Sequence, residues 1–206
     1  MITGRTTPEA PKLDTISVMS ILLALVILTT QQPATAQQPY KPKVGQEGRD
    51  AVWVPTSPEL VEKMLDMAKV TADDFVIDLG SGDGRMVIAA AKRGARALGV
   101  EFNPEMVKLA QQNAKEAGVS DRATFVQGDM FEADISKATV LALFLLPANL
   151  QQLEPKFRAL RPGTRIVVNS FGVPGWTPDE TETITGDCQS WCTAMLYRVP
   201  PRDPRP

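Results

Sequence analysis

A glycine-rich turn preceded by an acidic residue is the first feature of this sequence that could carry chemistry. The segment VIDLGSGDGR, residues 76–85, places Gly80, Gly82 and Gly84 at alternate positions directly after a short apolar run. Glycines at this spacing allow the backbone to turn tightly and a ligand to approach it closely. The segment therefore predicts a binding loop at the end of a strand.

Two kinds of phosphate-binding loop do not fit this turn. A Walker loop ends in Gly-Lys followed by Ser or Thr, whereas Arg85 follows Gly84 here. The dinucleotide fingerprint requires GxGxxG, and the spacing here is GxGxG. Asp78 would moreover repel a pyrophosphate and attract an ammonium or sulfonium group. The turn therefore favours a ligand with a cationic part.

Two further carboxylates end the next two predicted strands. Glu101 stands where it can accept hydrogen bonds from both hydroxyls of a ribose. Asp129 can accept a bond from an adenine amino group, with Met130 and Phe131 available to pack on the ring. Each carboxylate alone is equally typical of a helix cap or a turn, so the prediction depends on their order along the chain. Together they predict a site for an adenosine joined to a cationic amino acid, which is S-adenosylmethionine (SAM).

Helical and strand-like segments alternate from residue 51 onward and would position these residues. Thr56 and Glu59 have the spacing of a capping box at the start of the first helix. We expect helices at 56–70, 84–94, 103–118 and 148–160. We expect strands at 75–79, 96–101, 122–127, 139–145 and 164–170, and a terminal hairpin at 181–186 and 191–199. This order predicts an α/β fold with a mainly parallel sheet, whose ligands bind beyond the carboxyl ends of the strands.

The composition excludes several classes of chemistry. The 206 residues, 43% of them hydrophobic, suit one globular domain with a sizeable core. The sequence contains no histidine, which excludes Ser-His-Asp catalysis, histidine-based zinc sites and an imidazole base. The net charge of −2 and the lack of a basic block argue against a nucleic-acid partner. We expect no metal site, and proton transfer must use a carboxylate, Tyr, Lys or water.

The first 36 residues are predicted to lie outside the fold. Two basic residues precede an apolar run at 16–28, and a small-residue cleavage site follows at 34–36. This order is typical of a signal peptide, which predicts an exported or periplasmic protein. The alternatives are an N-terminal anchor that attaches the protein to a membrane through residues 16–28, or another targeting peptide. The expected organisation is a leader at 1–36, a linker at 37–50, one domain at 51–200 and a proline-rich tail at 201–206.

The two cysteines, Cys188 and Cys192, leave two alternatives. In an exported chain they could form a disulfide that closes a very short loop. The interpretation that we favour from the sequence is two unpaired thiols in the terminal hairpin. The pair alone is too sparse for a metal site.

Three segments resemble the motifs of class I SAM-dependent methyltransferases: VIDLGSGDGR, GVEFNP and QGDMFEAD. The resemblance implies a Rossmann-like, seven-stranded, mainly parallel sheet with helices on both faces and a C-terminal antiparallel hairpin. It also implies that SAM serves as the methyl donor. The residues that it assigns to SAM are Asp78, Gly80, Ser81, Gly82, Glu101, Phe102, Asp129 and Met130.

A narrower resemblance begins upstream of the glycine turn. VWVPTSPELVEKML, residues 52–65, followed by the turn is similar to the lysine methyltransferases that modify the mitochondrial ATP synthase (at its c-ring protein) and the adenine nucleotide translocase, and to their bacterial relatives. This resemblance implies a protein lysine as methyl acceptor. It places Pro55 and Thr56 in a lip near the methionine end of SAM, and the run from Phe144 to Pro147 along the methyl-transfer channel.

The acceptor side departs from the bacterial pattern of that family. Tyr is common at position 144, and His and Asp are common at the positions of Asn169 and Ser170, before a Phe that this chain keeps as Phe171. The chain therefore has fewer polar groups there. A small-molecule methyltransferase and an exported SAM- or nucleoside-binding protein without transferase activity remain alternatives. The channel candidates are Phe144, Pro147, Asn169, Ser170 and Phe171, and Trp176 is expected in the core or a lid, with the acceptor wall as the alternative.

Overall fold

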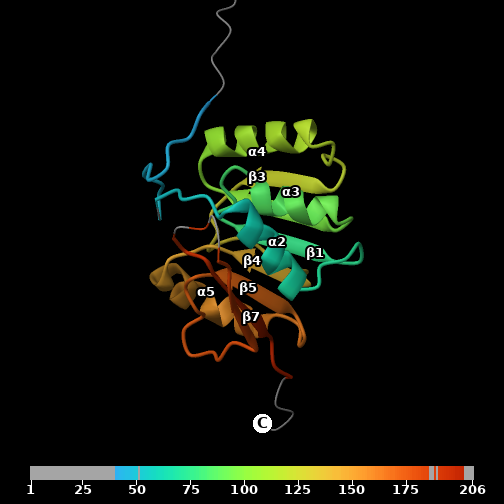
Figure 1. Ribbon diagram of the computed structural model, residues 1–206, viewed down its shortest axis with the longest axis vertical. Coiled ribbons are helices and arrows are strands. Elements are labelled where there is room, and N and C mark those ends of the chain that lie inside the picture. Colours follow the sequence, from blue (N-terminus) through green and yellow to red (C-terminus); the bar gives the residue numbers. More distant parts are fainter. Residues whose placement is uncertain (1–39, 51, 186–187, 189, 202–206) are drawn as a thin grey trace, which may run out of the picture. The chain divides into compact units, whose positions relative to one another are not determined.

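Strands and helices alternate through the part of the chain that the computed structural model describes, which is residues 40–50, 52–185, 188 and 190–201 (Figure 1). The predicted leader lies outside these residues, as does the end of the tail. The helices of the described part are α2 (Pro58–Met67), α3 (Arg85–Lys92), α4 (Pro104–Glu116) and α5 (Pro147–Ala159). Its strands are β1 (Phe75–Leu79), β2 (Arg96–Glu101), β3 (Ala123–Gln127), β4 (Val140–Leu143), β5 (Arg165–Asn169), β6 (Glu180–Thr183) and β7 (Thr193–Arg198).

The seven strands form one sheet in the order β3-β2-β1-β4-β5-β7-β6. The pairs among β3, β2, β1, β4 and β5 are all parallel. β7 lies antiparallel between β5 and β6, so the last hairpin inserts one reversed strand into the sheet. The expected seven-stranded Rossmann-like fold is confirmed.

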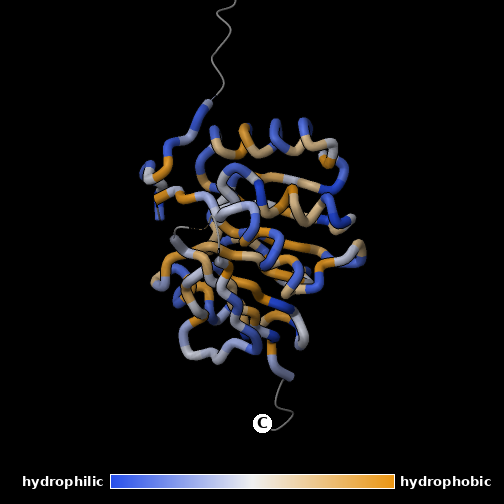
Figure 2. The backbone as a smooth tube through the Cα atoms, in the orientation of Figure 1, coloured by the Kyte–Doolittle hydropathy of each residue, from blue (hydrophilic) through white to orange (hydrophobic). Residues whose placement is uncertain are grey.

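Neighbouring residues of each strand point to opposite faces of the sheet, and helices cover both faces. Val76 packs with residues of α2, α3 and α4 in one apolar cluster. Its neighbour Ile77 packs with residues of α5 in a second cluster on the other face. Figure 2 shows the resulting pattern, with hydrophobic residues along the central strands and alternating hydropathy along α4. Burial on both faces explains why the strands are apolar without interruption.

The first helix begins one residue later than the sequence predicts. Ser57, not Thr56, is the cap, and its hydroxyl accepts a hydrogen bond of 3.2 Å from the backbone N–H of Leu60. The hydroxyl of Thr56 instead accepts a hydrogen bond from the Asn169 side chain. Thr56 and Ser57 are both suitable cap residues, and the spacing of residues along the chain does not show that Thr56 bonds to Asn169 instead. Asn103 caps α4 as expected, by accepting from the N–H of Glu105.

The strands nearest the middle of the sheet are shorter than predicted at their carboxyl ends. β4 stops before Phe144 and β5 stops before Ser170. Ser170 has a φ of 59°, which lies in the left-handed region and ends the extended backbone. The apolar runs continue past the strands because these residues line a site at the sheet edge. Within the described residues no helix has the length and apolar character needed to cross a membrane.

Candidate active site

Two adjoining cavities lie at the carboxyl ends of the parallel strands, where a doubly wound sheet binds its ligands. The larger has a volume of about 200 Å³ and extends from the ends of β2 and β4 to residues 46–50 and 52–54. The smaller, of about 50 Å³, lies over the glycine turn. Both are lined by Trp53, Val54, Gly80 and Phe144. The two cavities therefore meet at these four residues.

The glycine turn is held against β2 and has no space for a side chain at Gly82. The backbone N–H groups of Gly80 and Ser81 both donate to the carbonyl of Val100, at 2.8 and 3.1 Å. Gly82 has a φ of 55°, and a Cβ atom there would lie 2.7 Å from Nε1 of Trp53. A side chain at this position would displace the ring that lines both cavities.

Asp78 supplies a buried carboxyl group to the smaller cavity. The residue is only 7% exposed, and none of the described residues donates a hydrogen bond to its side chain. Burial, followed by the negative charges of Glu101 and Asp83, raises the pKa of Asp78 well above its usual range. A cation placed in this cavity would reverse that effect.

These residues fit the cationic part of SAM. The Asp78 carboxyl can accept from an ammonium group, and the buried hydroxyl of Ser81 has no hydrogen-bond partner within the described residues. An unpartnered hydroxyl beside an unpartnered carboxyl matches a ligand that carries both an ammonium and a carboxylate group.

Glu101 lies at the end of β2, at the border of the larger cavity. Its Oε2 accepts from the N–H of Gly82 at 3.0 Å, and its Oε1 accepts from the N–H of Asn103 at 2.9 Å. The carboxylate thus ties the glycine turn to the start of α4. Each oxygen has a further lone pair, so both can also accept from ribose hydroxyls.

Replacing Glu101 with Gln is expected to weaken SAM binding by about 1–2 kcal/mol. The amide nitrogen of Gln cannot accept a hydrogen bond, so one backbone N–H and one ribose hydroxyl lose their acceptor. Titration calorimetry with SAM measures the effect, and Glu105→Gln on the exposed start of α4 is the matched control. Unchanged affinity in Glu101→Gln would show that the ribose does not bind here.

Asp129 does not line either cavity, although its neighbours Gly128 and Met130 line the larger one. Its Oδ2 accepts from Nη2 of Arg49 at 2.7 Å, and its Oδ1 accepts from the N–H of Phe131 at 2.8 Å. The hydrogen bond from Arg49, then that from Phe131, lowers the pKa of Asp129. For the predicted hydrogen bond with adenine, the Asp129 carboxylate must either accept from adenine and Arg49 together or lose its hydrogen bond with Arg49.

Residues 46–50 and 52–54 form one wall of the larger cavity, a role that the sequence did not indicate. The N–H of Gly45 and the carbonyl of Trp53 are hydrogen-bonded at 2.8 Å, which folds the segment back on itself. The Arg49 guanidinium lies 4.4 Å from the ring centroid of Phe102. Part of the predicted linker is therefore in contact with the predicted adenosine side. No periodicity or motif marks such a contact in the sequence.

The lip at Val54, Pro55 and Thr56 lines the smaller cavity. Nη1 of Arg85 donates to the Thr56 carbonyl at 2.6 Å, and Arg85 also forms an ion pair with Asp83. The last two charged residues of VIDLGSGDGR thus hold the lip against the glycine turn. Their role was missed because an Asp-Gly-Arg sequence is also typical of an ordinary turn.

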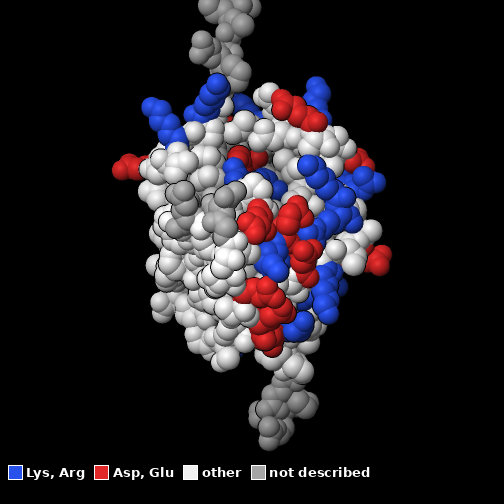
Figure 3. Space-filling view, viewed as in Figure 1, with Lys and Arg blue, Asp and Glu red and all other residues white. Residues whose placement is uncertain are grey.

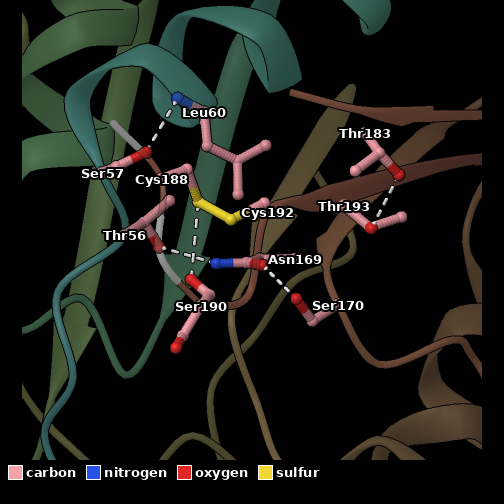
Figure 4. Close-up of a disulfide and its surroundings, with 10 residues drawn as sticks. All are labelled: Thr56, Ser57, Leu60, Asn169, Ser170, Thr183, Cys188, Ser190, Cys192 and Thr193. Carbon is pink, nitrogen blue, oxygen red and sulfur yellow. Dashed lines mark hydrogen bonds between the residues drawn. A yellow bond between two sulfur atoms is a disulfide. The ribbon is translucent and has the colours of Figure 1, made fainter. Parts of the chain in front are cut away.

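Of the predicted acceptor residues, Phe144 and Phe171 line the larger cavity, whereas Asn169, Ser170 and Pro147 line neither cavity. The rings of Phe144 and Phe171 lie 6.4 Å apart and both line the larger cavity. Asn169 is buried, donates to the Thr56 hydroxyl at 3.2 Å and accepts from the Ser170 hydroxyl at 2.8 Å (Figure 4). Pro147 begins α5 and lines neither cavity.

Trp176 lies apart from both cavities. Its indole N–H donates to Glu154 on α5 at 2.7 Å, and its ring packs edge-on against Tyr197 of β7. It belongs to the apolar cluster on the α5 face of the sheet.

Cys188 and Cys192 form a disulfide, so the expectation of two unpaired thiols was wrong. Their Cα atoms are 5.7 Å apart, a separation that suits a disulfide. Between them Trp191 lines the larger cavity, which no pattern in the sequence predicted. A single aromatic residue in a loop carries no such pattern.

Comparisons with known proteins show the family to which the chain belongs. A family model described as the ANTKMT methyltransferase domain matches residues 78–180. The chain is 47% identical over 131 residues to a protein-lysine N-methyltransferase of Saccharolobus islandicus, covering 62% of this chain and 81% of the relative. It is 33% identical over 162 residues to a human ATP synthase lysine N-methyltransferase, covering 72% and 69%.

A solved structure is similar over nearly its whole length. It is described as an RNA methyltransferase from Salinibacter ruber in complex with S-adenosyl-L-homocysteine, the product left when SAM loses its methyl group. The TM-score is 0.68 at 47% identity, and the match covers 74% of this chain and 98% of that one. SAM is therefore the methyl donor of this fold, as the residues predicted.

Proposed function

As a member of the family defined by the ANTKMT methyltransferase domain, the chain is a SAM-dependent methyltransferase, and we propose that its acceptor is a lysine side chain of a protein. Protein-lysine methyltransferases from Saccharolobus islandicus and from human both match it over more than two thirds of their own lengths. The site itself supports the same acceptor.

The observation that carries the proposal is the junction of the two cavities at Phe144. The smaller cavity contains the unpartnered Asp78 carboxyl and the larger one is bounded by Glu101 and Phe102. A ligand with an amino acid in the first and a nucleoside in the second would place its sulfonium group near Phe144. From that point the rings of Phe144 and Phe171 extend along the larger cavity. An apolar, aromatic passage suits the four-carbon stem of lysine.

The chemistry requires positioning and a neutral acceptor amine. SAM supplies a methyl group on a sulfonium centre, which an acceptor attacks in line without a covalent enzyme intermediate. A lysine ammonium must first lose its proton, and an apolar passage lowers its pKa because the charged form is desolvated there. Asn169 and Ser170 are bonded to each other, and Asn169 to Thr56, so these bonds tie the residues just before Phe171 to the lip. In the absence of a histidine, we assign the proton to water.

RNA is the alternative acceptor, because the similar Salinibacter ruber structure is described as an RNA methyltransferase. The charges of this chain favour a protein. On the face seen in Figure 3, acidic and basic side chains are mixed. Arg93 is one basic residue that is paired, with both Glu62 and Asp66. An RNA-binding surface would instead present unpaired basic side chains.

The test is methyl transfer from labelled SAM to a protein extract and, separately, to total RNA from the same cells. We expect label on a polypeptide, and amino-acid analysis should recover it as Nε-methylated lysine. Excess S-adenosylhomocysteine should abolish the labelling. Label that is removed by ribonuclease, or label on small molecules alone, would contradict the proposal.

We also propose that residues 1–36 direct the chain out of the cytosol. Two observations support this: the signal-peptide order of the sequence, and the Cys188–Cys192 disulfide, a bond that persists in oxidising compartments. Fractionation of cells that express the full chain tests it. Recovery of the protein with reduced cysteines in the cytosol would contradict the proposal.

A further inference from the structure

The loop between β6 and β7 brings a third aromatic ring to the predicted acceptor passage. The ring of Trp191 lies 6.1 Å from that of Phe144, which in turn lies 6.4 Å from that of Phe171. All three residues line the larger cavity. Trp191 is 45% exposed, so it stands at the mouth of the cavity.

The backbone of Trp191 has a conformation that its side chain does not favour. Its φ of 57° lies in the left-handed region, which bulky residues rarely adopt. Such a residue persists only when its surroundings determine it. The loop that contains it must therefore be held from both sides.

The Cys188–Cys192 disulfide and two backbone hydrogen bonds hold it. The disulfide closes the loop around Trp191 and lies beside Thr56 and Asn169 (Figure 4). The carbonyl of Cys192 accepts from the N–H of Ile184 at 2.9 Å, and the carbonyl of Thr193 accepts from the N–H of Ser170 at 2.7 Å. Both cysteines also pack against the apolar cluster on the α2 face. The loop is thus fixed to β6, to β5 and to the core.

The three aromatic rings at the mouth of the larger cavity favour a ligand that has both a positive charge and an apolar stem. The face of an aromatic ring attracts an ammonium group, and tryptophan does so most strongly. The same rings also pack against the methylene stem of a lysine side chain. A tryptophan at this position would contact the acceptor and not the donor, because SAM is expected between Asp78 and Phe102.

We propose that Trp191, held at the mouth by the Cys188–Cys192 disulfide, is a specificity-determining residue that binds the acceptor lysine. The disulfide acts as its positioning element, so opening the disulfide weakens acceptor binding and leaves SAM binding unchanged. This inference rests on the proposed function, since it assumes a lysine acceptor.

The test uses a probe that binds as lysine does and cannot react further, Nα-acetyl-Nε-trimethyllysine methylamide. An NMR titration of the S-adenosylhomocysteine-loaded protein measures its affinity. We expect Trp191→Ala to weaken probe binding about fivefold, and Trp191→Phe to weaken it less. The double variant Cys188→Ser/Cys192→Ser should show a loss similar to Trp191→Ala. Adding Trp191→Ala to that double variant should cause little further loss, since both changes remove one interaction.

Two measurements separate this role from a structural one. Affinity for S-adenosylhomocysteine should be the same in all these variants. Trp176→Phe, which alters a tryptophan outside both cavities, should leave probe binding unchanged. Equal probe affinity in the wild type and Trp191→Ala, no saturable binding to either, or an equal loss of S-adenosylhomocysteine affinity would overturn the assignment of Trp191. Full probe affinity in the double cysteine variant would overturn the positioning role of the disulfide.

The outcomes also distinguish the inference from the proposed function. A protein that labels no polypeptide contradicts the proposed function, and the inference, which assumes a lysine acceptor, fails with it. A protein that labels lysine equally well with and without the Trp191 ring contradicts only the inference.

Discussion

Replacing Asp78 with Asn is expected to weaken SAM binding by about 1.5–3 kcal/mol, which is about tenfold to a hundredfold in affinity. The reason is the loss of a charged acceptor for the cationic part of SAM in a buried site. The side chains have nearly the same shape, so the change removes the charge without opening a hole. Titration calorimetry measures the affinity, and Glu132→Gln removes an equal charge from an exposed position as the control.

The same substitution is expected to stabilise the ligand-free protein at neutral pH. The pKa of Asp78 in the folded state is raised by burial, then by Glu101 and Asp83, above its value in the unfolded chain. Ionising this group therefore opposes folding, and wild-type stability falls as the pH rises from the unfolded pKa, about 3.9, through the raised folded pKa. Asn cannot ionise, so the Asp78→Asn variant does not lose stability in this way as the pH rises.

Urea unfolding of ligand-free protein at several pH values measures the effect. The stability curves of wild type and Asp78→Asn should separate as the pH rises, with the variant more stable above the raised pKa. A less stable variant at pH 7 would mean that the carboxylate has a partner in the folded state, and that the cation site is assigned wrongly.

Replacing Asp74 with Ala is expected to lower the free energy of unfolding by about 3–5 kcal/mol, the range for breaking a buried ion pair. Asp74 is 6% exposed and forms an ion pair with Arg165. It also accepts hydrogen bonds from the Thr139 hydroxyl at 2.7 Å and from the N–H of Thr71 at 2.9 Å. Among the described residues, the substitution leaves the Arg165 charge with two carbonyl partners, those of Ala68 and Lys69.

This cluster lies at the amino ends of the strands, away from the cavities. Burial raises the pKa of Asp74, but the hydrogen bonds from Thr71, Thr139 and Arg165 outweigh it and the net pKa is lowered. The stabilisation is therefore present above the unfolded pKa, about 3.9, and is lost as the pH falls through the folded pKa.

Urea unfolding at pH 7 and at low pH tests both statements. The difference between wild type and Asp74→Ala should be largest at pH 7 and should shrink in acid. Asp73→Ala, on the exposed neighbouring residue, is the control and should change stability by less than about 0.5 kcal/mol. A loss for Asp74→Ala that does not depend on pH would contradict the assignment to its charge.

The sequence predicted the elements that local patterns encode. Continuous apolar runs separated by helical periodicity were enough for the alternation of β1, α3, β2 and α4, because each is marked by its own residues. The glycine turn after β1 and the carboxylates at the ends of β1 and β2 were enough to predict that Asp78 and Glu101 lie beside a ligand site. These features depend on spacing along the chain and not on contacts between distant segments.

Most features that the sequence did not predict depend on contacts between residues that are far apart in the chain. Thr56 bonds Asn169 rather than capping α2, Arg49 reaches Asp129 from the start of the domain, and Trp191 reaches Phe144 from its end. The pairing of the two cysteines depends on how the connecting loop folds. The sequence around each of these residues does not specify which distant polar or aromatic side chain it will contact in the fold.

The reversed direction of β7 decides which edge of the sheet the last connection of the chain reaches. β6 runs parallel to β5, because each is antiparallel to β7, so β6 ends at the same edge as β1, β2 and β4. The chain turns back there before entering β7. Had the final strand been parallel, a crossover would have been needed to return the chain to the opposite edge before the strand began. The hairpin instead brings Trp191 to the carboxyl ends of the parallel strands without a crossover, so a residue from the end of the chain reaches the cavity that the first strands of the chain form.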